Sequence, residues 1–114
     1  MNVREREVDG VLVLELSGDM MGGPEAQALN EELRKYAEAG KKYVVIDLGG
    51  VKLINSSGLG LLIAGLTVVR NREGDVRLAN LSTKVEKLLQ VTKLNKVFRT
   101  FPSVEDAVQS YHVS

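Results

Sequence analysis

The chain has 114 residues, which predicts one domain over residues 1–114, and its 15 Lys and Arg balance its 15 Asp and Glu. A formal net charge of zero argues against direct nucleic-acid binding, because domains that bind nucleic acid normally carry a basic excess. The absence of cysteine excludes thiolate chemistry and Cys-based zinc sites, and a single histidine removes most imidazole-based metal sites; we expect neither a metal nor a cofactor.

The amino-terminal part of the chain predicts an antiparallel hairpin. Two β-type runs, over 3–8 and 11–16, flank Asp9-Gly10, where glycine takes a positive φ without strain. The run over 3–8 is rich in charged residues, so we expect it at a sheet edge, where these side chains face water.

Helices and strands alternate through the rest of the chain. Apolar residues at three- and four-residue spacing predict the helices, and short apolar or alternating runs predict the strands. The helices are expected between Pro24 and Gly40, from the turn at 55–57 to 70–72, over 83–94, and from an N-cap at Ser103; the strands are expected over 43–48, 75–80 and 97–101. With the hairpin, this order predicts an α/β domain whose mixed sheet has about five strands and about four helices.

Two further local signals refine this prediction. The run over 43–48 is apolar at successive positions, which is typical of a central strand buried on both faces. Thr83 and Glu86 have the spacing of a capping box, so Thr83 is expected to be the N-cap of the third helix.

The chain contains no signal for a membrane segment. The apolar-rich stretch from Leu59 to Val69 is far shorter than the roughly 20 residues that span a bilayer. The start of the chain, over residues 1–7, lacks the apolar core of a signal peptide. By elimination we expect a cytoplasmic protein without membrane insertion.

The polar turn before the second helix carries the clearest chemical signal. Asn55, Ser56 and Ser57 are all suited to cap a helix, so two hydroxyls should lie near free N–H groups at the positive end of the helix dipole. Such a position accommodates an added phosphate. The alternative is that one serine only caps the helix. Gly58 and Gly60 allow either close packing against the sheet or an open surface for a partner.

The block Ile54-Asn55-Ser56-Ser57-Gly58-Leu59-Gly60, preceded by Val45-Ile46-Asp47-Leu48, resembles the signature of the STAS domain. More narrowly, it resembles bacterial anti-sigma factor antagonists. The resemblance covers nearly the whole chain, including Ser17-Gly18-Asp19 and the region 92–98. It implies a STAS-like single domain, opening with the β-hairpin, that acts in signal transduction and is not an enzyme.

In the family that this chain resembles, partner switching regulates transcription. A dephosphorylated antagonist binds an anti-sigma factor, often itself a serine kinase, and so releases a sigma factor. The kinase phosphorylates a serine of the antagonist, and a PP2C-type serine phosphatase removes the phosphate. The resemblance therefore implies a phosphoprotein whose partners are an anti-sigma factor kinase and a phosphatase, with ATP belonging to the kinase.

Carried over by position, the resemblance implies Ser56 as the phosphorylation site, with Ser57 as the alternative. Asn55 stands where the family usually has Asp, which leaves open whether switching here is slower, differently regulated or absent, or whether repulsion of the phosphate is reduced. The residues expected to bind the partner are Asp19, Met20, Met21, Gly22, Asn55, Ser56, Ser57, Gly58, Leu59 and Gly60. For the two methionines and Leu59, packing into the core is the alternative.

Two other functions are consistent with parts of the pattern. A STAS docking subunit of another assembly, such as a lipid-transport ATPase complex, would use the same surface constitutively, and Ser56 would only cap the helix. A serine hydrolase would need a general base, and only His112, on a different element, is available. The chain lacks a phosphate-binding Gly-x4-Gly-Lys-Ser/Thr loop, so we do not expect independent nucleotide hydrolysis.

Overall fold

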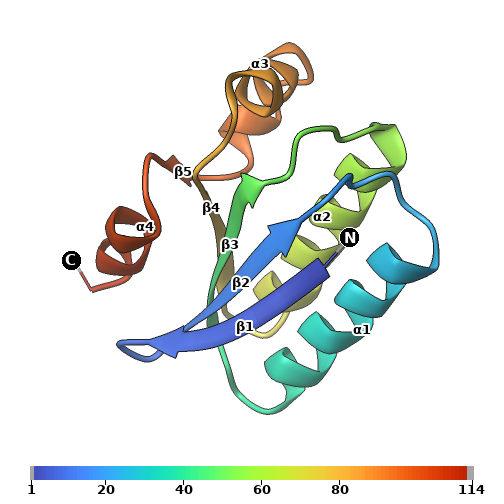
Figure 1. The fold of residues 1–114 in the computed structure, drawn as a ribbon. Helices are drawn as coiled ribbons and strands as arrows, with labels where there is room; N and C mark the ends of the chain where they lie inside the picture. The colour runs from blue at the N-terminus through green and yellow to red at the C-terminus, as the bar shows by residue number, and fades with distance from the viewer. Residues whose placement is uncertain (1, 113–114) are drawn as a thin grey trace.

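The computed structural model describes residues 2–112, and for Glu25 and Ala26 it describes the backbone only. Five strands form one sheet in the order β1-β2-β3-β4-β5 (Figure 1). The antiparallel pairing of β1 with β2 and the parallel pairing of the others confirm the predicted mixed sheet. The elements are β1 (Asn2–Val8), β2 (Val11–Ser17), α1 (Pro24–Glu38), β3 (Tyr43–Gly50), α2 (Ser56–Arg70), β4 (Asp75–Ala79), α3 (Thr83–Val91), the 3-10 turn η1 (Leu94–Lys96), β5 (Thr100–Phe101) and α4 (Val104–Ser110).

The opening hairpin has the predicted turn. Asp9 and Gly10 both have a positive φ, 50° and 79°, which matches the right-handed twist of the flanking strands. β1 pairs only with β2 along the sheet order, and its residues from Asn2 to Glu7 are exposed. The prediction of an edge strand with solvated charges is confirmed.

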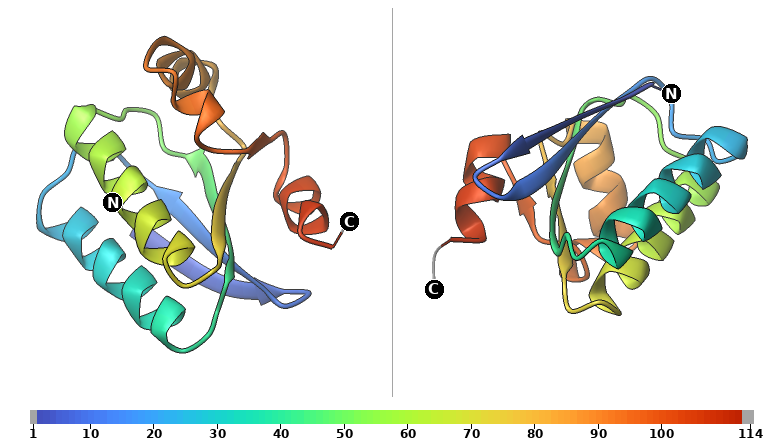
Figure 2. Two further views of the ribbon diagram at one scale, coloured as in Figure 1. Left: turned by 180° about the vertical axis from the view of Figure 1, so that it is seen from behind. Right: turned by 90° about the horizontal axis from the view of Figure 1, so that it is seen from below.

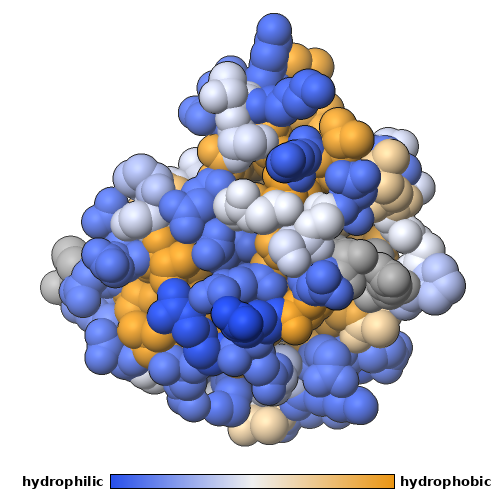
Figure 3. All heavy atoms as spheres, in the orientation of Figure 1, coloured by the Kyte–Doolittle hydropathy of each residue, from blue (hydrophilic) through white to orange (hydrophobic). Residues whose placement is uncertain are grey.

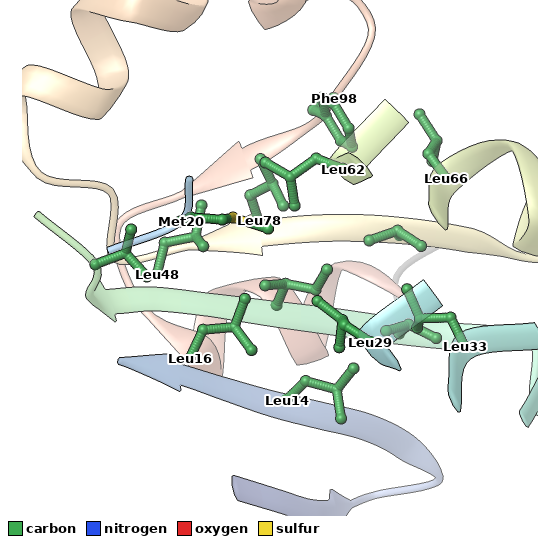
Figure 4. Packing of buried hydrophobic residues seen from close by; sticks show 14 of the residues in the cluster. Leu14, Leu16, Met20, Leu29, Leu33, Leu48, Leu62, Leu66, Leu78 and Phe98 are labelled. Atoms are coloured by element: carbon green, nitrogen blue, oxygen red, sulfur yellow. The ribbon is translucent and has the colours of Figure 1, made fainter. Parts of the chain in front are cut away.

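The larger core lies between the sheet and the helices α1 and α2 (Figures 1 and 2). Alternate residues of β2 and β3 point into it, and the helices contribute leucines at helical spacing. Figure 4 shows Met20 in the same core, near Leu48 and Leu78. This packing fixes the start of α2 against the ends of β2 and β3.

A smaller core lies on the opposite face of the sheet, where α4 packs (Figure 2). Val11, Val13 and Val45 belong to it, so β2 and β3 are buried on both faces, as the apolar run over 43–48 predicted. The hydroxyl of Tyr111 lies 2.7 Å from the carbonyl oxygen of Val44 and 2.8 Å from that of Asp75. Burial, and then the nearby Asp75 carboxylate, raise the pKa of Tyr111 above its ordinary value.

Two predicted boundaries are wrong. β5 contains only Thr100 and Phe101, because the amide groups of Val97 and Phe98 both donate to the carbonyl of Leu94 in a turn. Phe98 packs into the larger core from that turn. In the sequence it therefore has the apolar character of a buried strand residue, which explains the wrong prediction. The N-cap of α3 is Ser82, not Thr83, and its hydroxyl accepts from the Val85 amide at 3.2 Å.

The predicted starts of α1 and α4 agree with the structure, whereas α3 ends at Val91, before the predicted end at 94. α1 begins at Pro24, and Ser103 caps α4 by accepting from the amide of Asp106 at 3.0 Å. Among residues 2–112, no helix combines the length and the apolar character that a membrane span requires.

Candidate functional site

The candidate site lies where the loop 18–23 and the loop 51–55 run side by side before α2. The amide of Gly18 donates to the carbonyl of Gly50 at 3.0 Å, and the amide of Met20 donates to that of Leu53 at 2.8 Å. Met20 and Ile54 form a parallel bridge beyond the named strands. The structure therefore brings together the two segments that the sequence assigned to the partner surface.

Asn55 holds this junction with both its backbone and its side chain. Its Oδ1 accepts from the Gly58 amide at 2.8 Å, which makes Asn55 the N-cap of α2. Its Nδ2 donates to the carbonyl of Met21 at 3.0 Å, and its own amide donates to the carbonyl of Met20 at 3.3 Å. The amide side chain supplies both an acceptor and a donor, which a carboxylate does not, so Asn55 fixes the loop 18–23 to the helix terminus.

Ser56 and Ser57 are the first two residues of α2, and both are exposed. Because Asn55 is the cap, the alternative in which a serine caps this helix is wrong. Neither hydroxyl has a hydrogen-bond partner within the part of the chain that the structure describes. The first turn also contains no acidic residue, so the positive end of the helix dipole is not neutralised there.

The two glycines of this turn have different roles. A Cβ on Gly58 would overlap the carbonyl oxygen of Met20, so this position requires close packing against the loop. A Cβ on Gly60 would have no neighbour within 4 Å, so this position leaves an open surface. Each of the two sequence interpretations therefore holds for one glycine.

Gly22 makes the contact between the loop 18–23 and the serines. Its φ is +83°, and a Cβ there would lie 2.7 Å from the Cβ of Ser57. A side chain at this position would be strained by the backbone and would press on α2. Gly22 therefore lets the loop lie directly against the first turn.

Burial corrects the list of expected contact residues. The side chains of Met20 and Leu59 are 1% and 5% exposed, and Gly58 is buried, so none of the three presents a surface to a partner. Packing into the core, the alternative for Met20 and Leu59, is what the structure has. The residues that reach the surface at least in part are Asp19, Met21, Gly22, Asn55, Ser56, Ser57 and Gly60.

Lys52 and Leu53 lie beside this surface, and sequence reasoning did not identify them. Leu53 is 43% exposed, whereas Val51 is 1% exposed, although both belong to one apolar segment. Lys52 interrupts that segment, and this charged residue was the available signal that part of the segment is exposed. Which of the two apolar residues is exposed depends on the turn after β3, and composition does not predict the geometry of that turn.

His112 is not placed to activate a serine. Its Nε2 lies 2.9 Å from the carbonyl oxygen of Asp9 in the hairpin turn. It follows α4, which packs on the opposite face of the sheet from α2. The structure therefore gives Ser56 no histidine base. Over residues 2–112, no group of three or more potential His, Asp or Glu ligands could hold a metal ion.

Comparisons with known proteins give a consistent family. The model of the family described as "STAS domain" matches residues 2–107. The anti-sigma-B factor antagonist of Bacillus subtilis is 31% identical over 84 residues, 74% of this chain and 76% of that protein. BtrV of Bordetella bronchiseptica, provisionally named an anti-sigma factor antagonist, is 26% identical over 97% of this chain and 95% of that protein.

Solved structures share the fold. An anti-sigma factor antagonist from Mycobacterium paratuberculosis matches with a TM-score of 0.84 and 24% identity, covering 98% of this chain and 94% of that chain. The Bacillus protein SpoIIAA matches in its phosphorylated form with a TM-score of 0.75 and 17% identity, covering 96% of this chain and 99% of that chain. The unphosphorylated form of SpoIIAA matches with a TM-score of 0.74, 15% identity and 96% coverage of both chains.

Proposed function

The chain belongs to the STAS domain family, and from this premise we propose that it is an anti-sigma factor antagonist switched by phosphorylation of Ser56. In its dephosphorylated form it binds an anti-sigma factor that is also a serine kinase, and a sigma factor is released. A PP2C-type serine phosphatase reverses the modification. Two relatives that carry the name anti-sigma factor antagonist support this assignment.

The observation that carries the proposal is the position of Ser56. It is exposed at the first position of α2, next to the cap but not acting as it. Its hydroxyl therefore has no structural task that phosphorylation would disrupt. Ser57, the alternative acceptor, lies against Gly22, where a phosphate would have less room.

The proposed switch works at the surface and leaves the fold unchanged. A phosphate on Ser56 adds about −1.5 to −2 charges at neutral pH, and the free amides at the start of α2 stabilise an anion there. A partner packed over Met21, Asn55 and Ser56 would instead have to desolvate this dianion. Because every 1.4 kcal/mol changes affinity about tenfold, a penalty of a few kcal/mol is enough to release the partner.

The remaining assignments follow from the same proposal. The protein is the substrate of a kinase and carries out no reaction of its own, so it requires no cofactor. It acts in the cytoplasm, where the kinase finds ATP, as one domain over residues 1–114. Control of transcription is indirect, through the sigma factor, without contact with nucleic acid.

The test combines phosphorylation with binding. The wild-type chain is incubated with the purified anti-sigma factor kinase and ATP, and its intact mass is measured beside the variants Ser56→Ala and Ser57→Ala. We expect one added phosphate on the wild type and on Ser57→Ala, and none on Ser56→Ala. A phosphate that persists on Ser56→Ala would move the acceptor to another residue.

The residue at position 55 favours a second candidate function, which the same experiment tests. Asn55 removes the acidic side chain that the family usually places beside the acceptor. A wild-type chain that binds its partner and gains no phosphate would indicate a constitutive STAS docking subunit of another assembly, such as a lipid-transport ATPase complex.

A further inference from the structure

A second surface adjoins the candidate site on the side of α3. A groove of about 170 Å³ lies between the loop 51–55 and α3. It is lined by Lys52, Leu53, Ile54, Lys84, Val85 and Leu88, and is called the α3 groove below. Pockets for small molecules usually measure about 300–1,000 Å³, so this groove is suited to a side chain of a larger partner.

The α3 groove combines an apolar wall with a basic rim. Leu53 is 43% exposed, and Ile54 and Leu88 are partly buried, so apolar surface is accessible. Lys52 and Lys84 are both exposed. At the top of the molecule, where α3 lies, apolar side chains reach the surface among hydrophilic ones (Figure 3).

The charge of this region differs from that of the rest of the chain. The segment 81–101 contains five Lys and Arg and only one acidic residue, Glu86, although the whole chain is neutral. The remainder therefore carries a net negative charge. Such a segregated potential attracts an acidic partner and orients it on the α3 side.

The groove is continuous with the site at Ser56. Leu53 accepts a hydrogen bond from the Met20 amide, and Ile54 bridges Met20 as a parallel strand would. Asn55 and Ser56 follow directly in the chain. A partner that reaches the hydroxyl of Ser56 thus lies a few residues from the groove.

We infer that the α3 groove is a second docking surface for the same anti-sigma factor. It receives an acidic segment of that partner, with one apolar side chain against Leu53 and carboxylates at Lys52 and Lys84. This inference rests on the proposed function. It adds a contact that holds the kinase through a surface that adjoins the modified residue but does not include it.

The decisive experiment measures partner affinity with ADP present, so that no phosphate is transferred. The double variant Lys52→Glu/Lys84→Glu is compared with wild type at low and at high salt. We expect its dissociation constant to rise roughly tenfold or more at low salt, and the difference to shrink at high salt because exposed charges are screened.

A matched control separates the groove from net charge. Lys35→Glu/Lys42→Glu makes the same charge change at exposed lysines near the other end of the molecule, which pair only loosely with Glu32 and Glu73. This control should bind within about twofold of wild type. Equal weakening by both double variants, or unchanged binding of Lys52→Glu/Lys84→Glu, would overturn the inference.

A peptide titration keeps the inference testable apart from the proposed function. The labelled full chain is titrated with a synthetic peptide of two leucines among four glutamates, and with a control in which lysines replace the glutamates. The acidic peptide should shift the amide signals of Lys52, Leu53, Lys84 and Leu88, and Leu53→Ser should abolish the shifts. No shift would overturn the groove as a docking surface. Shifts in a wild-type chain that binds no anti-sigma factor would overturn the proposed function and the identity of the partner, but not the groove as a docking surface for an acidic segment.

Discussion

The two ends of the parallel strands use polar groups in opposite ways. At the amino ends of β3 and β4, side chains satisfy one another: Arg77 donates to Asp75 at 3.3 Å and lies 3.9 Å above the ring of Tyr111. At the carboxyl ends, Asn55 and backbone groups hold the loops, and the hydroxyls of Ser56 and Ser57 are left to solvent. Polar side chains thus stabilise the fold at both ends, and the serine hydroxyls at the carboxyl end are in addition available for recognition.

The largest effect on stability is expected at the start of α2, at the carboxyl ends of the parallel strands. Gly58→Ala places a Cβ on the carbonyl oxygen of Met20, and we expect a loss of about 2–3 kcal/mol in the free energy of unfolding. Gly60→Ala is the matched control, because it meets nothing within 4 Å and removes a helix glycine. It should leave stability unchanged or raise it by up to about 1 kcal/mol in urea unfolding. Equal effects of the two variants would show that the start of α2 is not held against the loop.

The second-largest effect on stability is expected at the amino ends of β3 and β4. Tyr111→Phe removes a hydroxyl that lies within hydrogen-bond distance of two carbonyl oxygens, and we expect a loss of about 2 kcal/mol at neutral pH. Since burial raises the folded-state pKa of Tyr111 above 10.0, the folded state binds the phenolic proton more tightly than the unfolded state. Its contribution is therefore complete below pH 10 and is lost as the pH rises further. Unfolding of both proteins between pH 7 and 11 checks this, and a difference that does not shrink would contradict it.

A smaller effect tests the role of Asn55. Asn55→Ala removes the cap of α2 and the bond to the carbonyl of Met21, and we expect a loss of about 1 kcal/mol. Asn55→Asp keeps the acceptor and loses only the donor, so stability should change less. In both variants, amide exchange over residues 20–23 should speed up. Unchanged exchange there would show that the side chain does not hold the loop.

The smallest effect completes the comparison. Ser56→Ala and Ser57→Ala should each change the free energy of unfolding by less than about 0.5 kcal/mol, because neither hydroxyl has an internal partner among the described residues. Chemical unfolding measures this directly. A loss near that of Asn55→Ala would assign the serine a structural role.

The sequence predicted most of the fold because its local signals agree with the tertiary packing. Asp9-Gly10, Pro24 and Ser103 each lie where the turn or helix start was expected. The region 97–101 failed because Phe98 reaches the core from a turn, and an apolar residue in a buried turn has the same sequence signature as a strand residue. Only long-range packing distinguishes the two.

The site was predicted in outline, and its details depend on contacts between distant segments. The turn at Ser56 was located, but the choice of Asn55 as cap depends on where the loop 18–23 places the carbonyl of Met21. Which of two adjacent methionines is buried, and that Leu53 is exposed, depends on the same loop geometry. These features depend on contacts between separate segments at the edge of the sheet, and the local sequence pattern does not predict such contacts.

The most direct test of the account compares one protein in two states. The wild-type chain is prepared with and without phosphate on Ser56, and both forms are assayed for affinity to the anti-sigma factor and for amide chemical shifts. We predict that phosphorylation weakens binding at least about a hundredfold, equal to about 2.8 kcal/mol, while shift changes stay within the loops 18–23 and 51–55 and the first turn of α2. Unchanged affinity, or shifts that spread across the sheet and α4, would contradict a switch that acts at the surface alone.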